Sequence, residues 1–99
     1  MAREQIYTWL GGRLPAISRF YGILVAMYHR EHGPPHFHVR YSGHKAVVGI
    51  EPLRVLHGKL PRRAEGLVLE WAATRQPESL DNWRRAEAQR SLAPIEPLD

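Results

Sequence analysis

Residues 36–50 read HFHVRYSGHKAVVGI, and this stretch decides the fold because it has the pattern of a β-hairpin. Ser42-Gly43 separates two strand-like runs, His36 to Tyr41 and Lys45 to Ile50, and a two-residue loop with glycine is typical of hairpins. The loop sets the register, and side chains then alternate between the two faces. One face is therefore predicted to belong to the core, and it carries Phe37, Val39, Tyr41, Ala46, Val48 and Ile50.

The opposite face of the hairpin is predicted to be a basic, imidazole-bearing surface. It carries His36, His38, Arg40 and Lys45, with Gly49 opposite His36. The register places Arg40 opposite Lys45, and two facing cations repel unless solvent or an anion lies between them. We therefore expect both histidines to point to solvent, on a surface suited to an anionic ligand.

Further strands are expected on both sides of the hairpin, and two helices after it. A β-branched and aromatic segment from Ile17 to Tyr28, interrupted by Gly22, indicates two strands or one bent strand. Another strand is plausible over Arg54 to Gly58, and helices are expected from Pro61 and from Pro77. The predicted class is α+β, a mostly antiparallel sheet of about four strands followed by two helices packed on one face. The first helix is expected to add Leu67, Val68 and Trp71 to the core, and the tail from Leu92 to Asp99 should be extended.

The length and composition are those of one small basic domain. We expect a single domain over residues 15–98 of the 99, preceded by an N-terminal appendage, residues 1–14. The absence of cysteine excludes disulfides, thiol nucleophiles and cysteine-ligated zinc. No apolar run is long enough to cross a bilayer, so the cytoplasm is the expected location and no membrane partner is expected. The formal charge of +4 and pI near 10.0 favour an anionic partner such as RNA, DNA or an acidic protein, although such a charge also simply keeps a small domain soluble.

The histidines admit three chemical interpretations: a metal site, an acid/base pair or phosphate binding. His36 and His38 lie on one side of the strand, and the stiff Gly33-Pro34-Pro35 turn holds His32 near its start. His32 or His29 could complete three metal ligands, although no well-placed carboxylate is evident. A divalent metal is therefore possible, but no cofactor is required. The structural alternative is that these histidines only keep the sheet face polar.

Several ordered sequence blocks point to a family. They are ISRFYG (17–22), HGPPHFH (32–38) followed by Tyr41, GKLPRRA (58–64), LVLEWA (67–72), Asn82-Trp83 and IEPL (95–98). Together they resemble a small bacterial family catalogued as a domain of unknown function, number 4160. The resemblance implies the toxin half of a two-gene toxin–antitoxin pair, with the cognate antitoxin encoded by a neighbouring gene. It carries over His32, Pro34, Pro35, His36, Phe37 and His38, with Arg19 and Tyr21 upstream, but no catalytic mechanism.

Three functions follow as hypotheses, and whether the protein is an enzyme differs among them. The first is a growth-inhibiting toxin that binds or cleaves nucleic acid, in which one imidazole takes a proton and the other gives one. The second is a non-catalytic module that docks an acidic partner protein, and the third is a metal-dependent hydrolase using His32, His36 and His38. The candidate catalytic residues are His36, His38 and Arg40, and the candidate binding residues are His32, Arg19, Tyr21, Lys45, Arg62 and Arg63.

Overall fold

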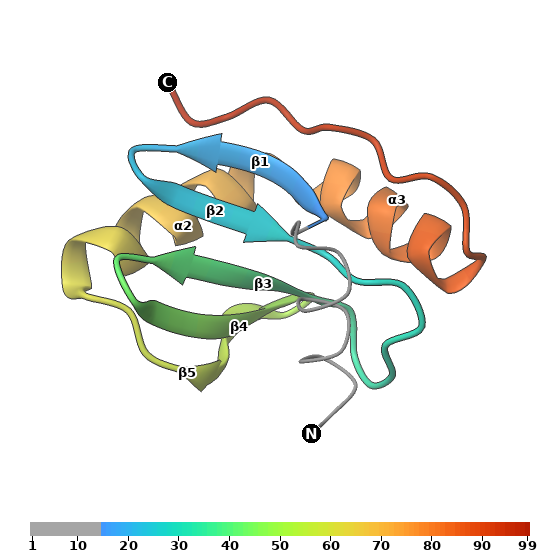
Figure 1. The fold of residues 1–99 in the computed structure, drawn as a ribbon, viewed down its shortest axis with the longest axis horizontal. Coiled ribbons are helices and arrows are strands. Elements are labelled where there is room, and N and C mark those ends of the chain that lie inside the picture. Colours follow the sequence, from blue (N-terminus) through green and yellow to red (C-terminus); the bar gives the residue numbers. More distant parts are fainter. Residues whose placement is uncertain (1–14) are drawn as a thin grey trace.

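The computed structural model describes residues 15–99 and consists of a five-stranded antiparallel sheet followed by two helices (Figure 1). The predicted α+β class is confirmed, and the predicted appendage, residues 1–14, lies outside the described residues. Strands adjacent in sequence are adjacent in the sheet, so the order is β1-β2-β3-β4-β5. The strands are β1 (Ala16–Phe20), β2 (Ile23–Ala26), β3 (His36–Tyr41), β4 (His44–Ile50) and β5 (Leu53–Gly58).

Two tight turns set the register of the sheet. Tyr21 and Gly22 join β1 to β2 with φ of 50° and 77°, and Ser42 and Gly43 join β3 to β4 with φ of 47° and 84°. Positive φ at both central positions matches the right-handed twist of the strands, and glycine adopts it without steric cost. The predicted register of the β3–β4 hairpin is confirmed, with Arg40 opposite Lys45 and His36 opposite Gly49.

The two helices begin at the predicted prolines. α2 (Arg62–Thr74) follows Pro61, and α3 (Gln76–Glu87) has Pro77 in its first turn. Proline suits a helix start because the first N–H groups have no intrahelical partner. No helix among residues 15–99 is long and apolar enough to span a membrane.

The core lies between α2 and one face of the sheet, as Figure 1 shows from the position of α2 behind the strands. Trp71 of α2 is 1% exposed, and its ring centroid lies 5.5 Å from that of Phe20 and 5.6 Å from that of Phe37. The predicted core is confirmed. Phe37, Val39, Val48, Ile50, Val68 and Trp71 are buried together, with Tyr41 and Leu67 partly buried against them.

The tail after α3 is extended, as predicted, and packs beside β1 (Figure 1). The Ile95 N–H donates to the Ile17 carbonyl at 2.8 Å, and the Trp71 Nε1–H donates to the Glu96 carbonyl at 2.8 Å. The side chain of Asn82 in α3 bonds both backbone groups of Ala93 at 2.8 Å. These bonds join the tail to the sheet and to both helices.

Candidate functional site

The connection between β2 and β3, residues 27–35, brings a carboxylate to the start of β3. Arg30 and Gly33 have φ of 65° and 96°, so the chain reverses sharply on both sides of Glu31. The His29 Nε2–H donates to the Arg90 carbonyl at 2.9 Å, and the Arg30 guanidinium donates to Gln89 at 3.1 Å. These bonds fasten the connection to the segment after α3.

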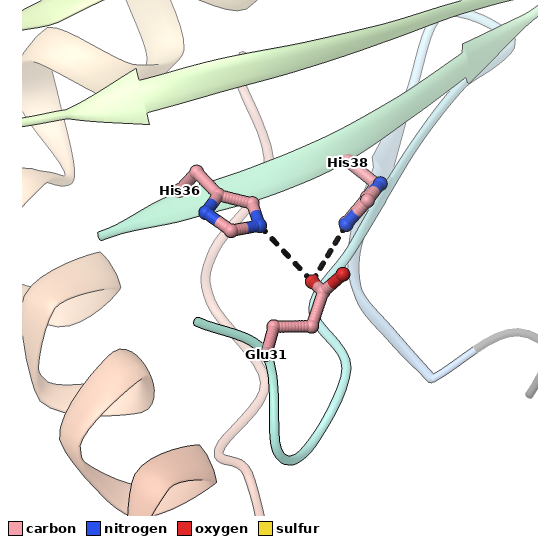
Figure 2. Close-up of side chains that lie close together, drawn as sticks. All are labelled: Glu31, His36 and His38. Carbon is pink, nitrogen blue, oxygen red and sulfur yellow. Dashed lines mark hydrogen bonds and ion pairs between the residues drawn. The ribbon is translucent and has the colours of Figure 1, made fainter. Parts of the chain in front are cut away.

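The side chains of Glu31, His36 and His38 converge, and we refer to them as the Glu31 cluster (Figure 2). Oε1 of Glu31 accepts a hydrogen bond from Nε2 of His36 at 3.1 Å and another from Nε2 of His38 at 2.7 Å. The side chains of His36, His38 and Glu31 are only 10%, 9% and 12% exposed. These three residues could hold a metal ion.

Neighbouring groups fix the orientation of both imidazole rings. The Tyr28 ring meets the His38 ring edge-on at a centroid distance of 4.7 Å, and the Trp83 ring lies 4.9 Å from that of His36. The Nδ1–H of His36 donates to the Pro34 carbonyl at 2.9 Å. Both Nε2 atoms are thereby directed at the same carboxylate oxygen.

The prediction that His36 and His38 are solvent-exposed is wrong. They do lie on the face opposite Phe37, but they are only 8% and 7% exposed as whole residues. Tyr28 from the β2–β3 connection and Trp83 from α3 pack against them, and strand alternation carries no information about such coverage.

The expectation that no carboxylate lies near these histidines is also wrong. Glu31 lies five residues before His36, and the reversal of the chain through residues 27–35 brings it back to β3. His32, the third histidine of the predicted metal set, is exposed and is not part of the cluster. A Glu shortly before a His-x-His strand was the available sequence signal.

Two opposing effects act on the Glu31 carboxyl. Burial alone would raise the pKa of Glu31, but hydrogen bonds from His36 and His38, together with their charges, lower it from 4.5 to about 2. Glu31 is therefore a carboxylate at neutral pH. An acid/base reaction by the histidine pair would require both rings to give up this carboxylate, which counts against a catalytic pair facing substrate.

A second feature on the same face is a hollow lined by positive charge. Arg19, Leu24, Arg40 and Lys45 lie in register across β1 to β4. With the β3–β4 turn they surround a hollow of about 330 Å³, and no lining residue in the described part of the chain, residues 15–99, carries a carboxylate. We call this the basic hollow, and its cationic side chains are Arg19, Arg40 and Lys45, beside His44.

The sequence profile of the family described as "Domain of unknown function (DUF4160)" matches residues 22–84. The chain belongs to this family. The DUF4160 match runs from β2 into α3, so it includes the Glu31 cluster, Arg40 and Lys45, whereas Arg19 and Tyr21 lie before it. No curated protein and no solved structure shows significant similarity to the chain.

The remaining candidate residues in this DUF4160 protein lie in different places. Tyr21 is 58% exposed and lines a hollow of about 370 Å³ at the β1–β2 turn, which also includes Arg19. Arg62 and Arg63 are exposed at the start of α2 and do not line the basic hollow. The structure thus groups Arg19, Arg40 and Lys45, and it separates them from Arg62 and Arg63.

Proposed function

We propose that this DUF4160 protein binds RNA through the basic hollow and that it is the growth-inhibiting member of a two-gene toxin–antitoxin pair. The observation that carries the binding proposal is the convergence of Arg19, Arg40 and Lys45 on one hollow, whose lining among residues 15–99 contains no carboxylate. Cationic side chains grouped around one hollow attract anions. The toxin role comes from the family resemblance.

Phosphate is the anion that best suits these side chains. The two guanidinium groups, of Arg19 and Arg40, can each bind phosphate oxygens with two parallel N–H donors, and the Lys45 ammonium adds a point charge. At about 330 Å³ the hollow is at the lower end of the range for ligand sites. It therefore suits a phosphate group and its immediate neighbours.

An exposed aromatic ring favours RNA over an acidic protein. Tyr21 lines the hollow next to the basic one, and the two hollows share Arg19, Gly22 and Leu24. Single-stranded RNA binds where cations follow its backbone and aromatic rings stack on its bases. A 58% exposed tyrosine beside Arg19 offers such a ring.

The geometry supports binding rather than cleavage by the histidine pair, since both Nε2 atoms already bond to Glu31. The cluster supports the hollow indirectly, because His38 lies two residues before Arg40 on the same face of β3. In this proposal the protein works in the cytoplasm, and its antitoxin is encoded by the neighbouring gene. The hydrolase alternative requires a metal ion, whereas RNA binding by the hollow does not.

The test is the affinity for a fluorescent single-stranded RNA of about 12 nucleotides, measured by anisotropy at several salt concentrations. With three phosphate contacts, log K should fall with log salt at a slope of roughly −2, or about 20-fold between 50 and 200 mM. Arg40→Gln with Lys45→Gln should weaken binding and reduce the slope to roughly −0.7.

The matched control is Arg84→Gln with Arg90→Gln, which likewise removes two charges, at exposed residues that do not line the basic hollow. It should leave both affinity and slope close to those of the parent. Equal weakening by the control and by the Arg40 and Lys45 variants would contradict the proposal. Binding of a poly-Glu peptide without binding of RNA would favour the acidic-protein module instead.

A further inference from the structure

We propose that the Glu31 cluster is a binding site for one divalent transition-metal ion, with zinc the foremost candidate. The ligands would be Oε1 of Glu31, Nε2 of His36 and Nε2 of His38, which all lie within 4.8 Å of one another. This inference does not depend on RNA binding, because none of the three residues lines the basic hollow.

The donor set determines the class of ion. Two imidazole nitrogens and one carboxylate oxygen suit Zn²⁺ and the neighbouring first-row ions, whereas Ca²⁺ and Mg²⁺ prefer oxygen ligands throughout. Three protein ligands leave one tetrahedral position for water, as in catalytic rather than purely structural zinc sites. A metal-bound water is a stronger acid than free water, so the site could activate water for hydrolysis.

The distances require only a small adjustment. Bonds of about 2.0–2.2 Å to a tetrahedral ion place the ligand atoms roughly 3.4 Å apart. The two Nε2 atoms now lie 3.1 and 2.7 Å from the Glu31 oxygen. The carboxylate oxygen would have to move away by about 0.3 Å from the His36 Nε2 and by about 0.7 Å from the His38 Nε2. Glu31 belongs to a connection rather than to a strand of the sheet.

The surroundings of His36 match those of a metal-ligating histidine. Its Nδ1–H donates to the Pro34 carbonyl at 2.9 Å. Such a bond keeps a proton on Nδ1, which is the usual outer-shell arrangement of a metal-ligating histidine. Nε2 would bind the metal through its lone pair after releasing the proton that it now donates to Glu31. Pro34 precedes the strand by two residues, so the HGPPHFH segment (32–38) supplies both the ligand and its orienting acceptor.

The aromatic neighbours complete the site. Tyr28 is 2% exposed and Trp83 is 5% exposed, and their rings hold those of His38 and His36. An apolar shell limits access of water and keeps ligand orientation fixed before the ion arrives. A buried ionic cluster is a poor source of stability compared with apolar packing, and metal binding would give this cluster a role beyond stability.

The experiment uses untagged full-length protein, freed of metal by a chelator and then titrated with ZnCl₂ by calorimetry and with CoCl₂ by visible absorption. We expect one equivalent of each ion to bind and cobalt to give tetrahedral absorption bands. Glu31→Gln and His38→Asn should each weaken binding roughly 100-fold or more, beyond the effect typical of outer-shell changes. His57→Asn, at an exposed histidine of β5, should bind like the parent.

Because the two ligand variants could lose stability, the parent protein supplies an independent readout. In ¹⁵N spectra of the histidine rings, zinc should shift the Nε2 signals of two rings and leave the Nδ1 of His36 protonated. Absence of one-equivalent binding to the folded parent would overturn the proposal. Shifts confined to exposed rings, or loss of binding in His32→Asn, would also overturn it.

Discussion

Burial raises the pKa of Glu31, but the hydrogen bonds from His36 and His38 together with the charges of these histidines outweigh it and lower the pKa to about 2. A carboxyl whose pKa is lower in the folded than in the unfolded state contributes stability above its unfolded pKa and loses that contribution as pH falls. In metal-free protein the free energy of unfolding should therefore decrease between about pH 5 and pH 2, by on the order of 3 kcal/mol from Glu31. Urea unfolding at several pH values measures this decrease.

The matched variant for this pH prediction is Glu31→Gln, which keeps the size of the side chain and cannot ionise. It should be less stable than the parent at pH 6, and the difference should shrink as pH approaches 2. A difference that stays constant with pH would show that the Glu31 charge is not what the two imidazoles stabilise.

Because His38 is buried, its replacement should lower the free energy of unfolding more than replacement of an exposed histidine would. A solvent-exposed histidine could be replaced with little loss, but His38 is 7% exposed and donates at 2.7 Å to Glu31. His38→Ala should reduce the free energy of unfolding by about 3 kcal/mol, because it leaves a half-paired buried carboxylate. His57→Ala on β5 should change it by less than about 0.5 kcal/mol. Equal effects in urea unfolding would mean that His38 behaves as a surface residue.

In the candidate site, the sequence predicted which face of β3 the histidines occupy, but it did not predict their burial or their partner. The face of His36 and His38 followed from strand alternation, which is a local property. Their burial depends on Tyr28 and Trp83, and Trp83 lies 45 or more residues away in sequence. Their partner Glu31 was missed because a reversing connection, not a regular element, brings it back.

At the scale of elements, two glycines should respond in opposite ways to the same substitution. Gly58 ends β5 with φ of 79°, and a Cβ there would collide with the backbone of Lys45 and Ala46. Gly66 lies inside α2 with open space around the position of a Cβ. Gly58→Ala should destabilise the protein by more than about 1 kcal/mol, and Gly66→Ala should stabilise it by about 0.5–1 kcal/mol. Urea unfolding of both variants tests this, and effects of the same sign would contradict it.

The elements were largely predictable because their signals are short-range. Ser42-Gly43 defines a two-residue turn, and that turn determines the register of the whole β3–β4 hairpin. Pro61 and Pro77 indicate helix starts because proline lacks an N–H, and the N–H groups of the first helical turn have no intrahelical partner. The separation of β1 from β2 was left open, since one glycine is compatible with a bend or a turn. Positive φ at both Tyr21 and Gly22 makes it a turn.

At the scale of the whole molecule, the sheet places three of the 14 lysine and arginine side chains around one hollow. The meander brings Arg19, Arg40 and Lys45 together from three strands, and no sequence window contains them all. If the hollow carries the toxin activity, expression of the chain alone should slow growth, and co-expression of the neighbouring gene should restore it. Arg40→Gln with Lys45→Gln should also restore growth at equal soluble levels. Normal growth at high levels of soluble parent protein would contradict the toxin role.

The most direct test of the basic hollow as the functional site is the change in backbone amide NMR signals when a short single-stranded RNA is added. The largest changes should occur at Gly22 and at residues 40–45, which line the hollow. Smaller changes in α2 and in the tail would agree with RNA binding at the basic hollow. Changes centred on Arg62 and Arg63 at the start of α2, or no changes at concentrations where the RNA is soluble, would contradict it.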